Sequence, residues 1–143
     1  QPVLADLRDT LRAFRRAHGF GRGISAVQIG EPLRIIYVEF GGRPYHLIDP
    51  AWEWQSADTF ELWDDCFSFP NLMVRVRRAV SVRLRYREAD GTPGTLAAAG
   101  ALSELLQHEM DHLDGVLAID RAEGRDALAT REEWERRYRQ PLQ

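Results

Sequence analysis

The stretch LLQHEMDHLDG, residues 105–115, combines a helical apolar pattern with two histidines and a glutamate. On an α-helix, residues four positions apart lie on the same face, so His108 and His112 can direct their rings at one ion. Glu109 lies roughly 100° further around the helix, within reach of a water at that ion. The pattern therefore predicts either half of a catalytic metal site or a polar stripe on a surface helix.

The other side chains of this helix help to decide between the two interpretations. Most of its remaining large residues are apolar: Leu102, Leu105, Leu106, Met110 and Leu113. Such a helix is expected to be buried, and a buried polar cluster without partners would cost several kcal/mol. Because a bound ion would offset that cost, we favour the metal site.

A catalytic metal site usually has three protein ligands and one open position for water. Cys66 is the stronger candidate for the third ligand, because a thiolate binds zinc or ferrous iron well and the residue lies in a loop-like segment. Glu132 and Glu133 are alternatives in a highly charged segment that is typical of a solvated helix. A lone cysteine is also often a small buried core residue.

The sequence before this helix is mostly of β type. Strands are expected at 33–40, at 43–49, twice within 73–88, and near 94–98. Gly41-Gly42 and Asp90-Gly91 are expected to form the turns between them, and residues 51–71 to be irregular.

Helices are expected at 3–18, at 100–113 and near 130–139. Because strands precede and surround the late helix, the fold class is α+β, with mixed or antiparallel sheets packed around the helix that bears the HExxH motif. Residues 1–143 are interpreted as a single domain.

Composition narrows the class of protein. Hydrophobic residues make up 44% and charged residues 29%, a balance typical of a globular protein. A net charge of −3 gives no general reason to expect nucleic-acid binding, and no apolar run reaches the roughly 20 residues that span a membrane. The single cysteine excludes an intramolecular disulfide and fits a reducing compartment, so a cytoplasmic location is expected.

Three short segments resemble the motifs of the peptide deformylase family, whose members remove the N-formyl group from new polypeptides during protein biosynthesis. The family pattern G-Φ-G-Φ-A-A-x-Q corresponds to GRGISAVQ (21–28), E-G-C-Φ-S to DDCFS (64–68), and Q-H-E-x-D-H to QHEMDH (107–112). Their order matches and their spacing is similar. The resemblance covers nearly the whole chain, apart from an opening strand that the family has before the position of Val3.

The resemblance implies a metal site and a catalytic acid–base residue. Cys66, His108 and His112 would bind one divalent metal ion, Fe²⁺ or Zn²⁺. Glu109 would act first as general base and then as general acid.

It also implies an oxyanion hole formed by Gln28 and the backbone N–H of Phe67. Gly23 would lie at the substrate, which the family brings to this first motif.

Four positions depart from the family pattern, and one of them, Ser25 in place of an alanine, is a small change. Asp64 replaces a glutamate and could still pair with a cation such as Arg78. Arg22 replaces an apolar residue and Asp65 a glycine, and both segments border the substrate cleft in the family. Arg22 and Asp65 are therefore candidate substrate-binding residues. They could pair across the cleft and narrow it, or hold a polar group where a methionine side chain would otherwise lie; drift on a solvated loop is the alternative.

The sequence thus predicts metal-dependent hydrolysis of an N-formyl amide, releasing formate, with the formyl-methionine of peptides as the expected substrate. The alternatives are a hydrolase of a more polar N-formyl substrate, a small N-formyl amide included, and a non-catalytic binding domain. A general zinc endopeptidase is disfavoured by the cysteine ligand and the short tail after His112. The charged segment TREEWERRYRQ (130–140) is interpreted as a solvated helix, with a ribosome contact as the alternative.

Overall fold

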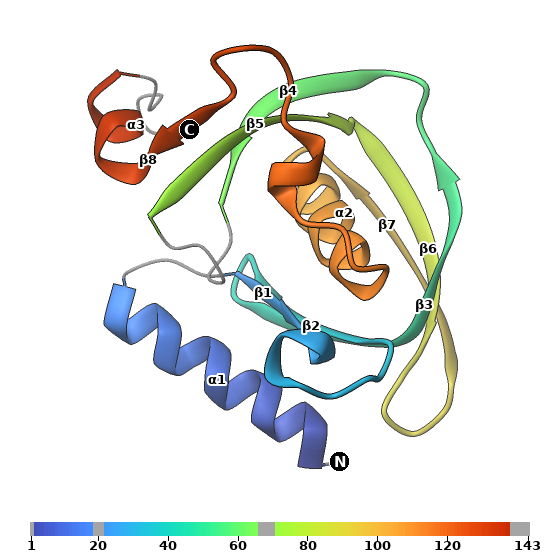
Figure 1. Cartoon of the computed structure of the whole chain (residues 1–143). Helices are drawn as coiled ribbons and strands as arrows, with labels where there is room; N and C mark the ends of the chain where they lie inside the picture. Colours follow the sequence, from blue (N-terminus) through green and yellow to red (C-terminus); the bar gives the residue numbers. More distant parts are fainter. Residues whose placement is uncertain (1, 19–21, 66–70, 138–143) are drawn as a thin grey trace.

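The computed structural model describes residues 2–18, 22–65 and 71–137 (Figure 1). The α-helices are α1 (Pro2–His18), α2 (Ala101–Leu113) and α3 (Arg131–Arg137). The strands are β1 (Gly23–Ser25), β2 (Ile35–Phe40), β3 (Arg43–Gln55), β4 (Thr59–Asp64), β5 (Leu72–Ala79), β6 (Ser81–Arg87), β7 (Pro93–Ala99) and β8 (Leu128–Thr130). Two short 3₁₀ helices are η1 (Ala26–Ile29) and η2 (Ala118–Arg121).

The strands form two antiparallel sheets with α2 between them. The larger sheet has the order β1-β2-β3-β6-β7 and the smaller one β4-β5-β8. Figure 1 shows α2 enclosed by the strands, while α1 lies outside, along β1 and β2. This arrangement confirms the predicted α+β fold with antiparallel sheets around the late helix.

Strand β2 is buried on both faces, which explains its run of apolar residues. Successive side chains of a strand point to opposite faces. Ile36 and Val38 belong to the apolar cluster around α2, whereas Ile35 and Tyr37 belong to the cluster beneath α1. The apolar face predicted for residues 3–18 packs there, with Leu7 and Leu11 fully buried.

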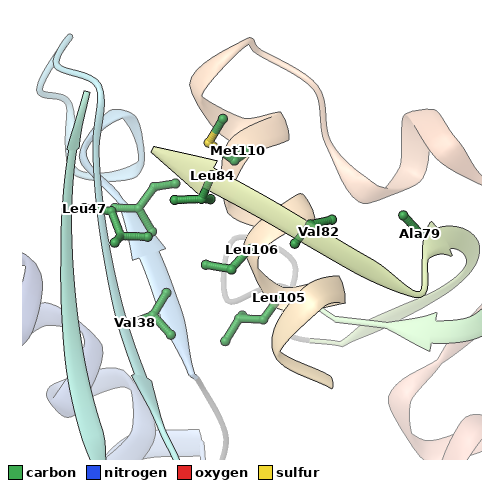
Figure 2. Close-up of a cluster of buried hydrophobic side chains, with 9 residues drawn as sticks. Val38, Leu47, Ala79, Val82, Leu84, Leu105, Leu106 and Met110 are labelled. Atoms are coloured by element: carbon green, nitrogen blue, oxygen red, sulfur yellow. The ribbon is translucent and has the colours of Figure 1, made fainter. Parts of the chain in front are cut away.

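The apolar face of α2 fills the centre of the fold (Figure 2). Leu105, Leu106 and Met110 pack in one cluster with side chains from β2, β3, β5 and β6, namely Ile36, Val38, Leu47, Ala79, Val82 and Leu84. Removing a buried leucine side chain typically costs about 2–5 kcal/mol. This packing fixes the rotation of α2, and with it the direction of its histidines.

A polar clamp fixes the same helix along its axis. Oε1 of Gln107 accepts a hydrogen bond from the backbone N–H of Ala79 at 2.9 Å, and Nε2 donates to the Ala79 carbonyl at 2.9 Å and to Ser103. Gln107 is buried, so these bonds satisfy its amide. In the motif QHEMDH the glutamine therefore positions the helix on β5.

The predicted hairpin is confirmed. Gly41 and Gly42, with φ of 61° and 75°, connect β2 and β3 in the left-handed conformations that a two-residue turn requires. The predicted turn at Asp90-Gly91 and the short strand near 94–98 are confirmed as well, and that strand is β7.

The expectation that residues 51–71 are irregular is wrong for most of the described part. Strand β3 continues to Gln55, and β4 follows from Thr59 to Asp64. The pairing of β3 with β6 shifts register between Ile48 and Ala51 and again between Trp52 and Trp54. Such irregularities break the alternation of apolar and polar residues on which the prediction depended.

The two strands expected within 73–88 are confirmed as β5 and β6, but they belong to different sheets. The short strands β1 and β8 were not predicted, because three residues carry too little periodicity. Among the described residues, no helix is both long and apolar enough to cross a membrane.

Candidate metal and catalytic site

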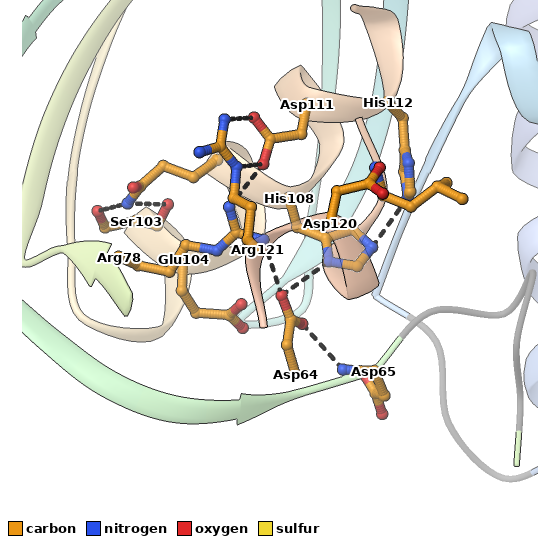
Figure 3. A network of polar contacts seen from close by, with 12 residues as sticks. Asp64, Asp65, Arg78, Ser103, Glu104, His108, Asp111, His112, Asp120 and Arg121 are labelled. Carbon is orange, nitrogen blue, oxygen red and sulfur yellow. Dashed lines mark hydrogen bonds and ion pairs between the residues drawn. The ribbon is translucent and has the colours of Figure 1, made fainter. Parts of the chain in front are cut away.

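The polar side chains of α2 that were predicted to carry the chemistry lie close together. His108, Glu109 and His112 are buried, and one potential ligand atom of each lies within 4.8 Å of the others. The two Nε2 atoms of the histidines are 2.9 Å apart (Figure 3). Two ring nitrogens at this distance form an N–H···N hydrogen bond in the absence of an ion, and both can turn their lone pairs to one metal ion when it binds.

The end of β4 orients the ring of His108. Nδ1 lies 2.8 Å from Oδ2 of Asp64, which as a carboxylate accepts the hydrogen bond. This bond leaves Nε2 as the atom that faces His112. Burial alone would raise the pKa of Asp64, but His108 and Arg78 together lower that pKa to about 2. A carboxylate behind a histidine is the usual way in which proteins orient a metal-binding ring.

Arg78 of β5 holds this carboxylate in turn. Its guanidinium, only 2% exposed, donates to Asp64 at 3.0 Å and to Asp111 at 2.7 Å. Arg121 of η2 donates to Asp111 from the outside, at 2.5 and 2.8 Å. The predicted pairing of Asp64 with Arg78 is therefore confirmed. Asp111 accepts hydrogen bonds from both arginines and so helps to hold Arg78 against Asp64.

His112 has the electronic state that metal binding needs. Burial, and then the neighbouring His108, lower the pKa of His112 to about 4. The ring is therefore neutral near pH 7 and keeps a lone pair for an ion.

Glu109 is buried next to both histidines. Oε1 of Glu109 has no hydrogen-bond partner within the described ranges of the chain. Burial raises the pKa of Glu109 to about 7, with His108 opposing the shift and Asp64 adding to it. A carboxyl group with a pKa near neutrality can both accept and return a proton, which is the property of a general acid–base catalyst.

Gly23 lies directly against this glutamate. A Cβ atom at position 23 would lie 3.2 Å from Cγ and Oε2 of Glu109 and from Cδ1 of Leu105. The glycine therefore allows β1 to approach α2 closely. The residue predicted at the substrate is thus brought to the predicted acid–base residue.

These residues fit a divalent metal ion. The donor set includes two neutral or neutralisable imidazoles, one of them held by a carboxylate. Two ligand nitrogens of one tetrahedral zinc ion are roughly 3.4 Å apart, so the observed pair needs only a small adjustment to hold an ion. Beside the two histidines, Oε1 of Glu109 has no partner among the described residues, so a polar ligand is needed there to donate a hydrogen bond to it.

Gln28 lies in η1, immediately after β1. Its Oε1 accepts hydrogen bonds from the backbone N–H of Ser25 at 2.9 Å and from the Ser25 hydroxyl at 3.2 Å. These two bonds fix the orientation of the Gln28 amide, because its oxygen faces Ser25 and its NH₂ group points away from Ser25. Gln28 is thus close in sequence to Gly23 and held rigidly, as a transition-state donor would have to be.

The two substrate-binding candidates do not pair with each other as one hypothesis required. Arg22 donates to Glu104 of α2, and Asp65 accepts from Arg131 at 2.9 Å. Glu104 was not predicted as a site residue, although its position four residues before His108 places it on the same helical face. Burial, followed by Asp64, raises the pKa of Glu104 to about 7 against the opposing charge of Arg22.

Cys66 and Phe67, the predicted third ligand and oxyanion donor, lie outside the described residues. Asp64 and Asp65, which precede them in the sequence, line a small hollow together with His112 and residues of β5 and η2. The alternative ligands are elsewhere: Glu133 of α3 pairs with Arg136 and Arg137, and Glu132 is on the same exposed helix.

The fold and the site together define a class: an α+β protein with a buried HExxH helix whose histidines are arranged for one metal ion. The sequence profile named polypeptide deformylase matches residues 1–127. The chain therefore belongs to the polypeptide deformylase family, which confirms the resemblance seen in its three motifs.

Individual relatives agree with this assignment. "Peptide deformylase 2" of Gloeobacter violaceus is 40% identical over 114 residues, which are 76% of this chain and 61% of that protein. The peptide deformylase of Dictyoglomus thermophilum is 36% identical over 115 residues, 80% of this chain and 73% of that protein. This chain thus spans between three fifths and three quarters of the length of these two relatives.

Solved structures give the same result. The peptide deformylase of Synechococcus elongatus, crystallised with actinonin, superposes with a TM-score of 0.74 at 34% identity, covering 84% of this chain and 69% of that one. The Thermus thermophilus enzyme has a TM-score of 0.77 at 29% identity, covering 85% of this chain and 71% of that one.

Proposed function

We propose that this protein hydrolyses the N-formyl group of formylated peptides with the help of one divalent metal ion, releasing formate. One observation carries the proposal: the Nε2 atoms of His108 and His112 lie 2.9 Å apart beside a buried oxygen of Glu109 that lacks a partner in the described part of the chain. Family membership supports the same activity. A non-catalytic binding domain would have no need for the buried glutamate.

Cys66, His108 and His112 are the proposed ligands, and Fe²⁺ or Zn²⁺ the proposed ion. Support for Cys66 comes from its neighbours, because Asp64 bonds to His108 and Asp65 lines the same hollow as His112. Thiolate and imidazole ligands suit both ferrous iron and zinc. When bound, the ion supplies a Lewis acid that makes a water molecule a stronger acid.

The side chains of the site divide the remaining work. Glu109 takes a proton from water, and the water oxygen bonds to the formyl carbon. The amide of Gln28 and, by the family motif, the backbone N–H of Phe67 donate to the oxygen on which negative charge develops. The C–N bond then breaks, and Glu109 returns its proton to the leaving amine nitrogen. Formate and a free N-terminus result.

The edge of β1 is the proposed place for the peptide. The carbonyl of Arg22 accepts a hydrogen bond from the backbone N–H of Glu39 in β2. In an antiparallel pair of strands the backbone groups of successive residues point alternately toward and away from the partner strand. The N–H and C=O groups of Gly23 therefore point away from β2, to the free edge of β1. Strand β1 is an outer strand of its sheet, so an extended peptide can pair there next to Glu109. A cytoplasmic location and a ribosome contact through residues 130–140 remain predictions.

The test is formate release from formyl-Met-Ala-Ser by protein loaded anaerobically with Fe²⁺ or with Zn²⁺. The wild-type protein is expected to release formate, and Glu109→Gln to keep its metal while losing at least about two orders of magnitude in kcat. Glu53→Gln changes an exposed residue of β3, in the larger sheet; it is the control and should retain full activity. Retention of metal by the wild-type protein without any formate release would refute the proposal.

A further inference from the structure

Two residues of opposite charge lie beside the proposed acid–base residue, at the place to which β1 brings the substrate. Arg22 immediately precedes Gly23, whose Cβ position lies 3.2 Å from Oε2 of Glu109. Glu104 lies one helical turn before His108, and the charges of Arg22 and Glu104 both act on Glu109. Figure 3 shows the Glu104 side chain extending from α2 on the side of Asp64 and His108.

The pair is incompletely satisfied. Arg22 donates from Nη2 to Oε1 of Glu104, whose side chain is only 5% exposed. Oε2 of Glu104 is buried and receives no hydrogen bond from any residue that the structure describes. The Arg22 side chain is 38% exposed, so part of it also faces solvent. A buried acceptor without a donor costs free energy that an N–H group of a ligand would recover.

The contrast with the neighbouring carboxylate of Asp64 is informative. That carboxylate is bonded through Oδ2 to both His108 and Arg78, and through Oδ1 to the backbone N–H of Asp65. Glu104 is as deeply buried as Asp64 but has one oxygen left over. The two pairs differ in the kind of atom left over: the Asp64–Arg78 pair leaves a donor, Nε of Arg78, whereas the Arg22–Glu104 pair leaves a carboxylate oxygen that can accept from a ligand.

We propose that Arg22 and Glu104 form a polar subsite for the first side chain of the N-formyl peptide and favour a side chain with an amide group. The inference rests on the proposed function and specifies its substrate class. An amide NH₂ can donate to Oε2 of Glu104, and an amide oxygen can accept from the guanidinium of Arg22. A thioether is a weak acceptor without a donor, so it leaves both groups unsatisfied.

The experiment compares matched peptides within each protein variant. kcat/KM for formate release is measured with formyl-Gln-Ala-Ser, formyl-Met-Ala-Ser and formyl-Gly-Ala-Ser, using metal-loaded wild type and the double variant Arg22→Leu with Glu104→Leu. The ratio of Gln to Met substrate is expected to fall by at least about tenfold in the double variant, because a site built for hydrogen bonds discriminates strongly. This ratio does not depend on the fraction of active protein.

Two controls make the result specific. Arg83→Leu with Glu53→Leu removes another arginine–glutamate pair, joined at 2.7 Å on the larger sheet, and should leave the ratio unchanged. Arg22→Lys keeps the positive charge and should retain most of the preference for the glutamine peptide.

The outcomes separate this inference from the proposed function. A ratio that changes by less than about twofold in the double variant would show that the pair is only structural and would overturn the inference. The inference would also be overturned if the wild-type protein preferred the glycine peptide and the double variant had a higher kcat/KM with both the Met and the Gln peptide. In that case the pair would only narrow the cleft. No formate from any peptide, with metal bound, would overturn the proposed function together with the inference.

Discussion

Two buried carboxylates lie at the polar face of α2, and they differ in how completely they are bonded. Asp64 is shared by His108, Arg78 and a backbone N–H. Glu104 has Arg22 as its charged partner and an oxygen that nothing in the described chain contacts by hydrogen bond. The first group is complete without a ligand and serves to orient the site. The second is arranged to meet a molecule from outside.

The largest expected difference between the two carboxylates concerns stability. Asp64→Asn leaves the buried guanidinium of Arg78 without its full charge partner and should lower the free energy of unfolding by about 3 kcal/mol. At pH 5, Glu104→Gln should change it by less than about 1 kcal/mol, because the Arg22 side chain is partly exposed. Urea denaturation of the two metal-free variants measures both values. Equal losses would mean that the two carboxylates do not differ as described.

The second prediction concerns metal affinity. Asp64→Asn weakens the orientation of the His108 ring and should reduce affinity by about 10–100-fold, as is typical for partners behind a metal ligand. Glu104→Gln should leave affinity within about threefold of wild type, since the hydrogen bond of Glu104 is made with Arg22 and orients no histidine. Competition against a chromophoric chelator gives the numbers. A matching loss in both variants would contradict the distinction.

A third prediction concerns Arg131, a residue of the C-terminal part of the chain that bonds to Asp65, next to Asp64. Arg131 donates from its backbone to the Asn71 carbonyl at 2.7 Å and from its guanidinium to Asp65 at 2.9 Å. These two partners follow and precede the segment 66–70 that contains the proposed ligand Cys66. Arg131→Ala should therefore release metal several-fold faster than wild type.

The same measurement has internal controls. Arg131→Lys should recover part of the loss, and Arg136→Ala, on the exposed face of α3, should have no effect. Stopped-flow transfer of the metal to excess chelator reports the rate. Release from Arg131→Ala at the wild-type rate would show that Arg131 does not position the metal-binding segment.

The smallest effect concerns pH, and it has opposite signs at two carboxyl groups. Burial raises the pKa of Glu104 from 4.5 to about 7, so the contribution of Glu104 is full at low pH and is lost as pH rises toward 7. Hydrogen bonds from Tyr37, Arg15 and Arg12 overcome burial and lower the pKa of Glu39 to about 2, so its contribution is present above pH 4.5 and is lost as pH falls toward 2.

Two isosteric variants separate these contributions. Glu104→Gln should gain stability relative to wild type between pH 5 and about 8, and Glu39→Gln should flatten the loss of stability below about pH 4. Urea denaturation across this pH range, in the absence of metal, measures both slopes. The difference in stability between each variant and wild type should change with pH in opposite directions for the two variants. A change in the same direction would contradict the assigned pKa shifts.

Much of the site could be predicted from sequence because its central residues lie on one helix. The offsets between His108, Glu109 and His112 fix their relative directions as soon as the helix forms. The turn at Gly41-Gly42 was equally predictable, since its conformation depends on two adjacent residues. The register shifts in β3 were not, because they arise from pairing with β6, which lies far along the chain with β4 and β5 between them.

Local sequence by itself determined the helix with its metal-binding pattern, the hairpin, the three motifs and hence the family. Only the tertiary structure decided which charges meet: Arg22 could have paired with Asp65, and it pairs with Glu104 instead. Helical spacing is a property of the covalent chain and can be read residue by residue. The partner of a long charged side chain depends on the packing of distant segments and on the energetic cost of burying each group, and these are set only when the whole chain folds.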